Sequence, residues 1–280
     1  MDRNQILCRA DELNSLLDDP NIRIVDGSWH LPNANRDALF EYQKDHIPGA
    51  VFFDIDTASD PNSGLPHTMP DAATFSTYAG SLGITDEHQI IVYDTAGLFS
   101  AARVWWMFRQ FGATNVRVLD GGLPAWKNAG LPTTSDVVEI ASVKFNASAP
   151  RDVVGLSAMR SHVDVGDVQI LDARGAGRFS GKEAEPRPGM RAGHMPNATN
   201  VPFTALLNDD GTVKSTDDLK ALFAEKQVDE TAPIVTSCGS GVTAAIIVLA
   251  LELIGCRNAQ LYDGSWSEWG SLQDTPIEVD

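Results

Sequence analysis

The sequence has 280 residues, 43% of them hydrophobic, and a formal net charge of −17. A chain of this size can form two ordinary domains or one large one, and its acidity, which no basic patch offsets, argues against nucleic acid and anionic membrane surfaces as partners. The amino terminus lacks the features of a secretory signal, and no apolar run reaches the ~18 residues needed to span a bilayer. We therefore expect a cytoplasmic protein that binds neither nucleic acid nor membranes.

In chain order, short β-rich runs alternate with helical patterns, and the second half of the sequence repeats the order of the first. The predicted strands are 22–26, 89–93, 115–119, 169–172, 234–237 and 260–262, and the predicted helices are 100–111 and 242–253. This alternation predicts an α/β fold in which each half has a mostly parallel sheet flanked by helices.

Local motifs also recur in the same order in the two halves, which is a strong sign of duplication. The matched motifs are Val25-Asp26-Gly27 with Leu171-Asp172-Ala173, His46 to Ala50 with His194 to Ala198, Ile91 to Asp94 with Ile234 to Ser237, Leu119 to Gly122 with Tyr262 to Ser265, and Trp126 with Trp269. The stretch 133–151 between the halves has weak periodicity and the composition of a linker. We therefore expect a first domain at 1–135, a linker at 136–155 and a second domain at 156–280.

The three cysteines, Cys8, Cys238 and Cys256, are odd in number and form no Cys-x-x-Cys pair. This pattern argues against a disulfide framework or a zinc cluster. No nucleotide-binding motif is present either, so we expect no metal and no cofactor, and each cysteine has to be judged by its own surroundings.

Cys238 lies where a predicted strand turns into a predicted helix. The loop that follows contains Gly239 and Gly241, which allow successive backbone N–H groups to converge, and the helix adds the positive end of its dipole. Such a loop favours an anion, so the backbone of Gly239, Gly241, Val242 and Thr243 is predicted to bind substrate. A thiolate stabilised in this way is the reactive form of a cysteine, which makes Cys238 a candidate nucleophile.

The corresponding loop of the first half provides an internal comparison. Matching the two halves aligns Thr95 with Cys238, and the segment from Thr95 to Ser100 contains no thiol. Chemistry is therefore expected in the second domain, and the first domain is expected to be without a catalytic cysteine.

The combined motifs resemble those of the 3-mercaptopyruvate sulfurtransferases of the rhodanese superfamily. The resemblance rests on Cys238 to Ala244, Gly177-Arg178-Phe179, Glu185-Pro186-Arg187, Tyr262 to Trp266, His46 to Asp56 and Arg103 to Met107. It implies two tandem rhodanese domains, the second one active. It also implies that Cys238 takes sulfur from 3-mercaptopyruvate as a persulfide, releases pyruvate, and passes the sulfur to a thiol acceptor such as thioredoxin or to cyanide.

The resemblance also assigns roles to other residues. Arg178 and Arg187 match the substrate-binding arginines of the family, and a planar guanidinium suits the paired oxygens of an α-keto acid. Ser240, two residues after the nucleophile, can assist the proton transfer that a pyruvate enolate needs. Asp56 and His67 match the aspartate and histidine that approach this serine in the family, which implies a relay of Ser240, His67 and Asp56.

Three alternatives remain. A thiosulfate-using rhodanese shares the fold and the persulfide, but its loop typically has basic side chains after the cysteine, whereas Gly239-Ser240-Gly241 is neutral. A cysteine phosphatase needs an arginine at the end of this loop, where Val242-Thr243-Ala244 has none. A non-catalytic rhodanese-like binding protein is the third alternative, and the retained cysteine, glycines and arginines argue against it.

Overall fold

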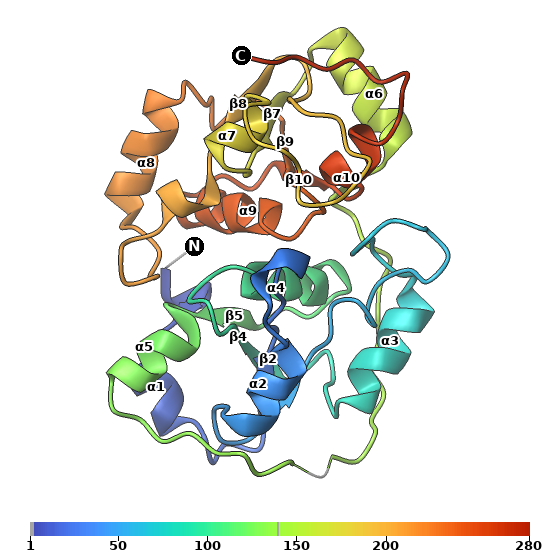
Figure 1. Cartoon of the computed structure of the whole chain (residues 1–280). Coiled ribbons are helices and arrows are strands. Elements are labelled where there is room, and N and C mark those ends of the chain that lie inside the picture. Colours follow the sequence, from blue (N-terminus) through green and yellow to red (C-terminus); the bar gives the residue numbers. More distant parts are fainter. Residues whose placement is uncertain (1–2, 139) are drawn as a thin grey trace. The chain divides into compact units, whose positions relative to one another are not determined.

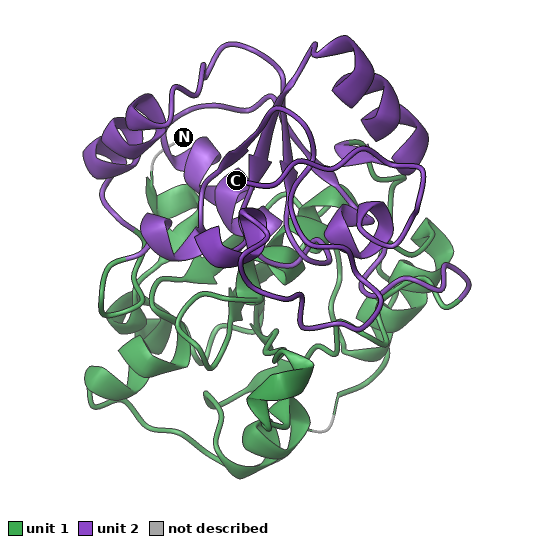
Figure 2. Ribbon diagram, turned by 45° about the horizontal axis from the view of Figure 1, so that its top comes forward, with its two compact units in different colours: residues 1–61, 69–151, 208–213 green, residues 62–68, 152–207, 214–280 purple. Residues whose placement is uncertain are grey.

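The computed structural model describes residues 3–138 and 140–280, which form two compact units (Figures 1 and 2). Unit 1 comprises the described residues of 1–61, 69–151 and 208–213, and unit 2 comprises 62–68, 152–207 and 214–280. No helix within the described ranges is both long and apolar enough to cross a membrane.

Unit 1 contains a five-stranded sheet in the order β1-β5-β4-β2-β3, with every pair of neighbouring strands parallel. The strands are β1 Leu7–Cys8, β2 Ile22–Asp26, β3 Ala50–Phe52, β4 Gln89–Tyr93 and β5 Val116–Leu119. The helices are η1 Arg3–Gln5, α1 Ala10–Ser15, η2 Pro32–Ala34, α2 Ala38–Lys44, α3 Ala72–Ser81, α4 Ala101–Gln110 and α5 Gly122–Asn128.

Unit 2 repeats this topology with the order β6-β10-β9-β7-β8, again entirely parallel. The strands are β6 Val153–Val154, β7 Gln169–Asp172, β8 Ala198–Asn200, β9 Ile234–Ser237 and β10 Ala259–Tyr262. The helices are α6 Leu156–Val165, α7 Ala176–Phe179, η3 Phe203–Leu206, α8 Thr216–Glu225, α9 Ala244–Leu253 and α10 Ser265–Trp269. The predicted fold class and the duplication are therefore confirmed.

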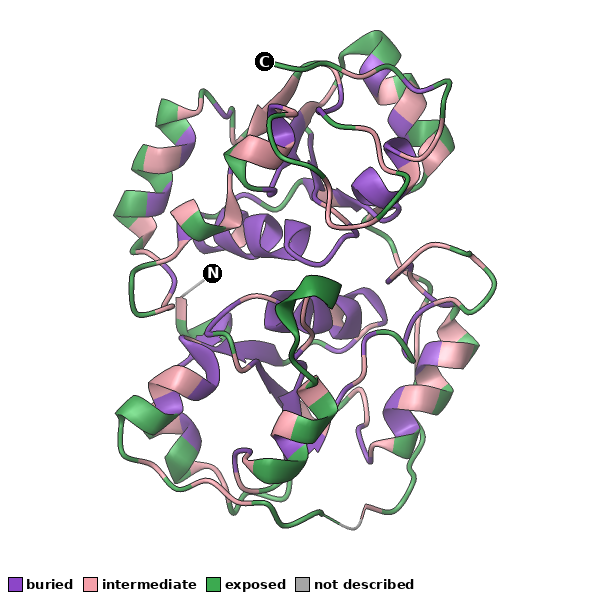
Figure 3. Cartoon of the chain, viewed as in Figure 1, coloured by how far each residue is buried: buried purple, intermediate pink, exposed green. Residues whose placement is uncertain are grey.

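The helices that follow the central strands, α4 and α9, are almost completely buried (Figure 3). The α9 sequence, Ala244-Ala245-Ile246-Ile247-Val248-Leu249-Ala250-Leu251, is apolar on every side, as expected of a helix enclosed by protein. A helix packed in this way has little freedom to shift, so the loops at the amino-terminal ends of α4 and α9 are held on rigid supports.

The segment 136–151, expected as part of a linker, groups with unit 1 up to residue 151. Phe145 is completely buried and packs edge-on against Phe75 at a centroid distance of 5.4 Å. The Val143 N–H donates to the Gly80 carbonyl oxygen, with 3.0 Å between nitrogen and oxygen. A weakly periodic sequence thus contributes to the core of unit 1 through one aromatic residue, whereas the domain limits of 1–135 and 156–280 stay a prediction.

The strand registers show which residues of the two units correspond. Asp26 pairs with Tyr93 across β2 and β4, and Asp172 pairs with Ser237 across β7 and β9. Since Asp26 and Asp172 are equivalent by motif, Tyr93 is equivalent to Ser237, and the next residue, Asp94, is equivalent to Cys238.

The expected match of Thr95 with Cys238 is therefore wrong by one residue, as is the match of Ile91 with Ile234. The cause is a loop that is one residue longer in unit 1, with six residues between Asp94 and Ala101 but five between Cys238 and Ala244. If the loops are aligned from the starts of α4 and α9, Thr95 is matched with Cys238. If they are aligned from the ends of β4 and β9, Asp94 is matched with Cys238.

Candidate active site

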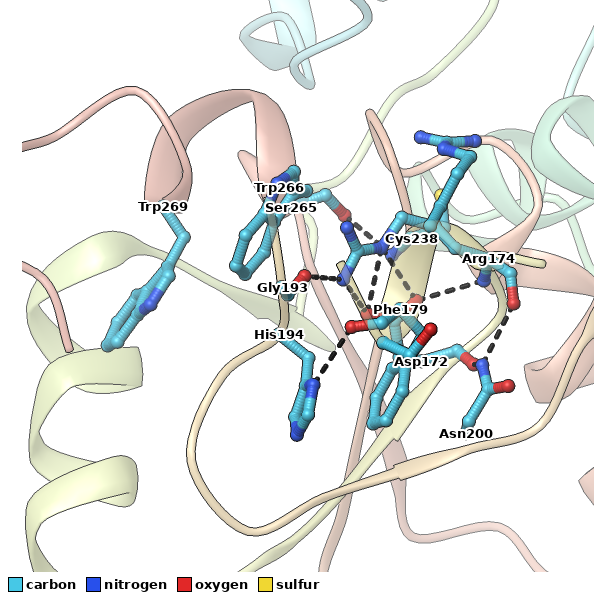
Figure 4. A network of polar contacts seen from close by, with 12 residues as sticks. Asp172, Arg174, Phe179, Gly193, His194, Asn200, Cys238, Ser265, Trp266 and Trp269 are labelled. Carbon is cyan, nitrogen blue, oxygen red and sulfur yellow. Dashed lines mark hydrogen bonds and ion pairs between the residues drawn. The ribbon is translucent and has the colours of Figure 1, made fainter. Parts of the chain in front are cut away.

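Cys238 follows directly after β9 and has 2% of its surface exposed. Its N–H donates to Ser265 Oγ at 3.2 Å, and its carbonyl oxygen accepts from the Trp266 N–H at 3.0 Å (Figure 4). Ser265 in turn donates from Oγ to the Tyr262 carbonyl oxygen at 2.9 Å. These bonds fasten the cysteine backbone to the start of α10, so the nucleophile predicted from sequence lies on a fixed turn.

The loop after Cys238 is held at its base and bends at its second glycine. The Gly239 carbonyl oxygen accepts from the Ser267 N–H at 2.8 Å and from Ser267 Oγ at 2.6 Å. Gly241 has φ = +77°, a conformation that side chains disfavour, so the sharp reversal before α9 explains this glycine. Val242 and Thr243 follow, both buried, and lead into α9.

Unit 1 shows what the equivalent loop binds. Asp94, with 1% exposure, points its carboxylate into its own loop. Oδ1 accepts from the Ala96 N–H at 2.9 Å, and Oδ2 accepts from the N–H groups of Phe99, Ser100 and Ala101 at 2.7, 2.9 and 2.8 Å. The same strand–loop–helix turn therefore surrounds a negative charge with four amide donors, as expected for an anion-binding turn at a helix amino terminus.

In unit 2, Cys238 takes the place of that carboxylate. By the correspondence of the loops, the amides equivalent to the four donors are those of Ser240, Val242, Thr243 and Ala244. Two of these four, Val242 and Thr243, are among the residues whose backbone is predicted from the sequence to bind substrate, and the other two predicted residues, Gly239 and Gly241, have no equivalent among the four donors.

Arg178 lies against the cysteine loop. A Cβ atom placed on Gly239 would be 3.0 Å from Arg178 Nη2, so the absence of a side chain at Gly239 makes room for the guanidinium. Arg178 Nε donates to Glu185 Oε1 at 3.2 Å, and Nη2 donates to Glu185 Oε2 at 2.5 Å. Arg187 is on the same loop, two residues after Glu185, and is partly buried. The structure thus brings Arg178 to the cysteine loop, and substrate binding by Arg187 stays a prediction.

His67 and Ser240 are in direct contact within unit 2, although 173 positions separate them in the sequence. His67 Nδ1 is 2.8 Å from Ser240 Oγ, and both residues are buried. His67 adopts φ = +62°, an uncommon conformation for a residue other than glycine. Asp56 belongs to unit 1, where its Oδ2 accepts from Trp29 Nε1 at 3.2 Å. Two members of the expected relay therefore meet, and the role of Asp56 stays a prediction.

The sequence predicts no role for Arg174, yet its side chain is one of the most enclosed charged groups of unit 2, with 0% exposure. Its Nη2 donates to Asp172 Oδ2 at 2.6 Å and to the Gly193 carbonyl oxygen at 2.9 Å (Figure 4). Burial by itself lowers the pKa of Arg174, but the carboxylates of Asp172 and Glu185 more than offset this and raise the pKa above its ordinary value. The guanidinium therefore stays charged inside the protein.

Comparison with known proteins places both halves of the chain in one family. The rhodanese-like domain model matches residues 9–129 and 156–272. The 3-mercaptopyruvate sulfurtransferase of Escherichia coli K12 is 45% identical over 271 residues, which cover 96% of each protein. The thiosulfate sulfurtransferase of Cricetulus griseus is 41% identical over 254 residues, covering 89% of this chain and 85% of that protein. The crystal structure of SseA from Escherichia coli superposes with a TM-score of 0.85 at 42% identity, covering 94% of this chain and 99% of that one.

Proposed function

The chain belongs to the rhodanese-like family, and on that premise we propose that it is a 3-mercaptopyruvate sulfurtransferase that carries sulfur on Cys238. The observation that carries the proposal is the setting of Cys238, on an anion-binding loop with the Arg178 guanidinium against Gly239. A thiolate, a persulfide anion and an α-keto acid are all negatively charged, and this setting stabilises each of them.

In the first half-reaction, the Cys238 thiolate attacks the sulfur of 3-mercaptopyruvate. A sulfur–sulfur bond forms, the carbon–sulfur bond breaks, and its electron pair goes to the carbon, which leaves as the pyruvate enolate. The thiol proton of the substrate is then transferred to that carbon and completes pyruvate. Arg178 and Arg187 hold the carboxylate and carbonyl oxygens of the substrate, and the loop amides of Gly239, Gly241, Val242 and Thr243 line the site of the developing charge.

In the second half-reaction, a thiolate acceptor or cyanide attacks the outer sulfur of the persulfide. The sulfur–sulfur bond breaks, and Cys238 returns as a thiolate. We propose a cytoplasmic thiol protein such as thioredoxin as the acceptor, with cyanide as its substitute in an assay. Neither step requires a metal or another cofactor.

The donor is tested by comparing pyruvate release from 3-mercaptopyruvate with thiocyanate formation from thiosulfate and cyanide. We expect the larger kcat/KM with 3-mercaptopyruvate, because Gly239-Ser240-Gly241 offers no cationic side chain to the doubly charged thiosulfate. A larger kcat/KM with thiosulfate would mean that thiosulfate is the sulfur donor, while the proposed Cys238 persulfide would stand. Such a result would be in line with the similarity to the Cricetulus griseus enzyme. No turnover of either donor would mean a binding protein.

Ser240→Ala should lower kcat for pyruvate formation by about 100-fold or more, because the substitution removes the hydroxyl that delivers a proton to the enolate carbon. Its contact with His67 Nδ1 at 2.8 Å supports this role. The measurement is the steady-state rate of pyruvate release. Ser271→Ala, which removes an unrelated hydroxyl bonded to the Glu268 carbonyl oxygen, should leave the rate unchanged. An unchanged kcat in Ser240→Ala would remove Ser240 and His67 from the mechanism.

A further inference from the structure

Glu185 joins two arginines of unit 2. Its Oε1 accepts from Arg174 Nη1 at 2.8 Å and from Arg178 Nε at 3.2 Å, and its Oε2 accepts from Arg178 Nη2 at 2.5 Å. The Glu185 side chain has 4% of its surface exposed, Arg174 0% and Arg178 20%. Charge-assisted hydrogen bonds in such an enclosed place are stronger and geometrically stricter than surface ion pairs.

Arg174 is fixed on its other sides as well. Its Nε donates to both oxygens of Asp172, at 3.1 and 3.0 Å, and its guanidinium carbon lies 4.2 Å from the centroid of the Trp266 ring. Trp266 is the residue whose N–H holds the Cys238 carbonyl oxygen. The Arg174 guanidinium is therefore held in one position beside the cysteine loop, and it in turn fixes the Glu185 carboxylate.

Unit 1 forms the same fold without this network. Asp26 Oδ1 accepts from the Ser28 N–H as Asp172 Oδ1 accepts from the Arg174 N–H, both at 2.9 Å, so Ser28 stands in the place of Arg174. Without a cation at that place, burial raises the pKa of Asp26 to about 6.

The place of Arg178 also has the opposite charge in unit 1. Tyr42 stacks on His46 with ring centroids 4.1 Å apart, and Phe179 stacks on His194 at 3.8 Å. Tyr42 and Phe179 are therefore equivalent, and the preceding residues, Glu41 and Arg178, are equivalent as well.

The segment that carries Glu185 is also specific to unit 2. Three residues separate Tyr42 from His46, whereas fourteen separate Phe179 from His194. Both arginines and the segment with Glu185 are thus absent from the copy without the cysteine. The network of Arg174, Glu185 and Arg178 is therefore not required by the fold, and it lies in the unit that contains Cys238. This indicates a role in the reaction rather than in folding.

We infer that Glu185 is a positioning residue, which uses Arg174 as a fixed support to hold the Arg178 guanidinium against the Gly239 turn for the carboxylate of the sulfur donor. This inference rests on the proposed function. Without Glu185, the long Arg178 side chain has many rotamers available, and ordering it on substrate binding costs affinity.

The test is the steady-state kinetics of pyruvate release by Glu185→Gln. We expect KM for 3-mercaptopyruvate to rise by about 10- to 100-fold, the size of one lost charge-assisted contact, with kcat changed by less than about threefold. Glu183→Gln, two residues away on the same loop, is the matched control and should leave both constants unchanged. Glu185→Asp keeps the charge but is one methylene shorter, so it should also raise KM, and it serves if Glu185→Gln does not fold.

A double-mutant cycle shows whether Glu185 acts through Arg178. In an Arg178→Lys background, removing the Glu185 carboxylate should raise KM by less than about threefold, because no guanidinium remains to be positioned. A KM that does not change in the single variants, or an effect as large in the Arg178→Lys background, would overturn the inference. A wild-type protein without activity on any sulfur donor would instead refute the proposed function, so the two failures are distinguishable.

Discussion

Cys238→Ser should lower pyruvate release from 3-mercaptopyruvate by at least about four orders of magnitude, the scale seen when a catalytic nucleophile is removed. A serine hydroxyl at this place can accept no sulfur atom from the donor, and its far higher pKa leaves it protonated near neutral pH. The measurement has two parts, the initial rate of pyruvate formation and the mass of the intact protein after incubation with the donor. The wild-type protein should gain one sulfur atom, and the variant should gain none.

Cys256→Ser is the matched control for this experiment. Cys256 is also buried, and its Sγ is 2.7 Å from Asn258 Oδ1, after the end of α9. Burial raises the pKa of its thiol, which makes it a poor nucleophile. The control should therefore load sulfur and release pyruvate as the wild-type protein does. If sulfur loading persisted in Cys238→Ser and were lost in Cys256→Ser, the persulfide would form on Cys256, and the assignment to Cys238 would be wrong.

Asp94→Ala should destabilise the protein by about 3 to 5 kcal/mol, because four N–H groups lose their acceptor at once and two of them, those of Ser100 and Ala101, are buried. Oδ2 alone accepts three of these bonds. The free energy of unfolding by urea measures the effect. Asp94→Asn keeps one carbonyl oxygen as an acceptor and should have an intermediate effect.

Asp71→Ala provides the scale for this comparison. Asp71 is an exposed residue that caps α3 by accepting one bond from the Thr74 N–H at 2.7 Å. Loss of such a cap costs about 1 kcal/mol. If Asp94→Ala is no more destabilising than Asp71→Ala, the carboxylate is not the main acceptor of this loop.

The sequence was sufficient where the relevant signal is local. The strand that ends before Cys238 and the glycines after it are adjacent in the chain, so the loop and the position of Cys238 at its start were predictable. The one-residue error at Thr95 had another origin. Nothing in the sequence tells on which side of a loop an extra residue has been inserted, and only the strand register identifies Asp94 as the equivalent of Cys238.

Contacts between distant residues were predictable only through resemblance or not at all. The contact of His67 with Ser240 spans 173 positions and was expected from the family alone. Arg174 received no role because its partners, Glu185 and Trp266, come from different segments, and no periodic pattern links an arginine to a buried carboxylate and an indole ring. A comparison of Arg174 with Ser28 in the repeat is the one signal that could have singled it out.

The carboxylate in the unit 1 loop has a consequence for inhibition of the protein. Asp94 is part of the chain, so its effective concentration at the four amides is far higher than that of any dissolved ion. Sulfite, sulfate or phosphate cannot displace it at ordinary concentrations. The loop that begins at Cys238 has a thiol in place of this carboxylate, so we expect inhibition by an anion at this turn to follow the kinetics of a single site in competition with the sulfur donor.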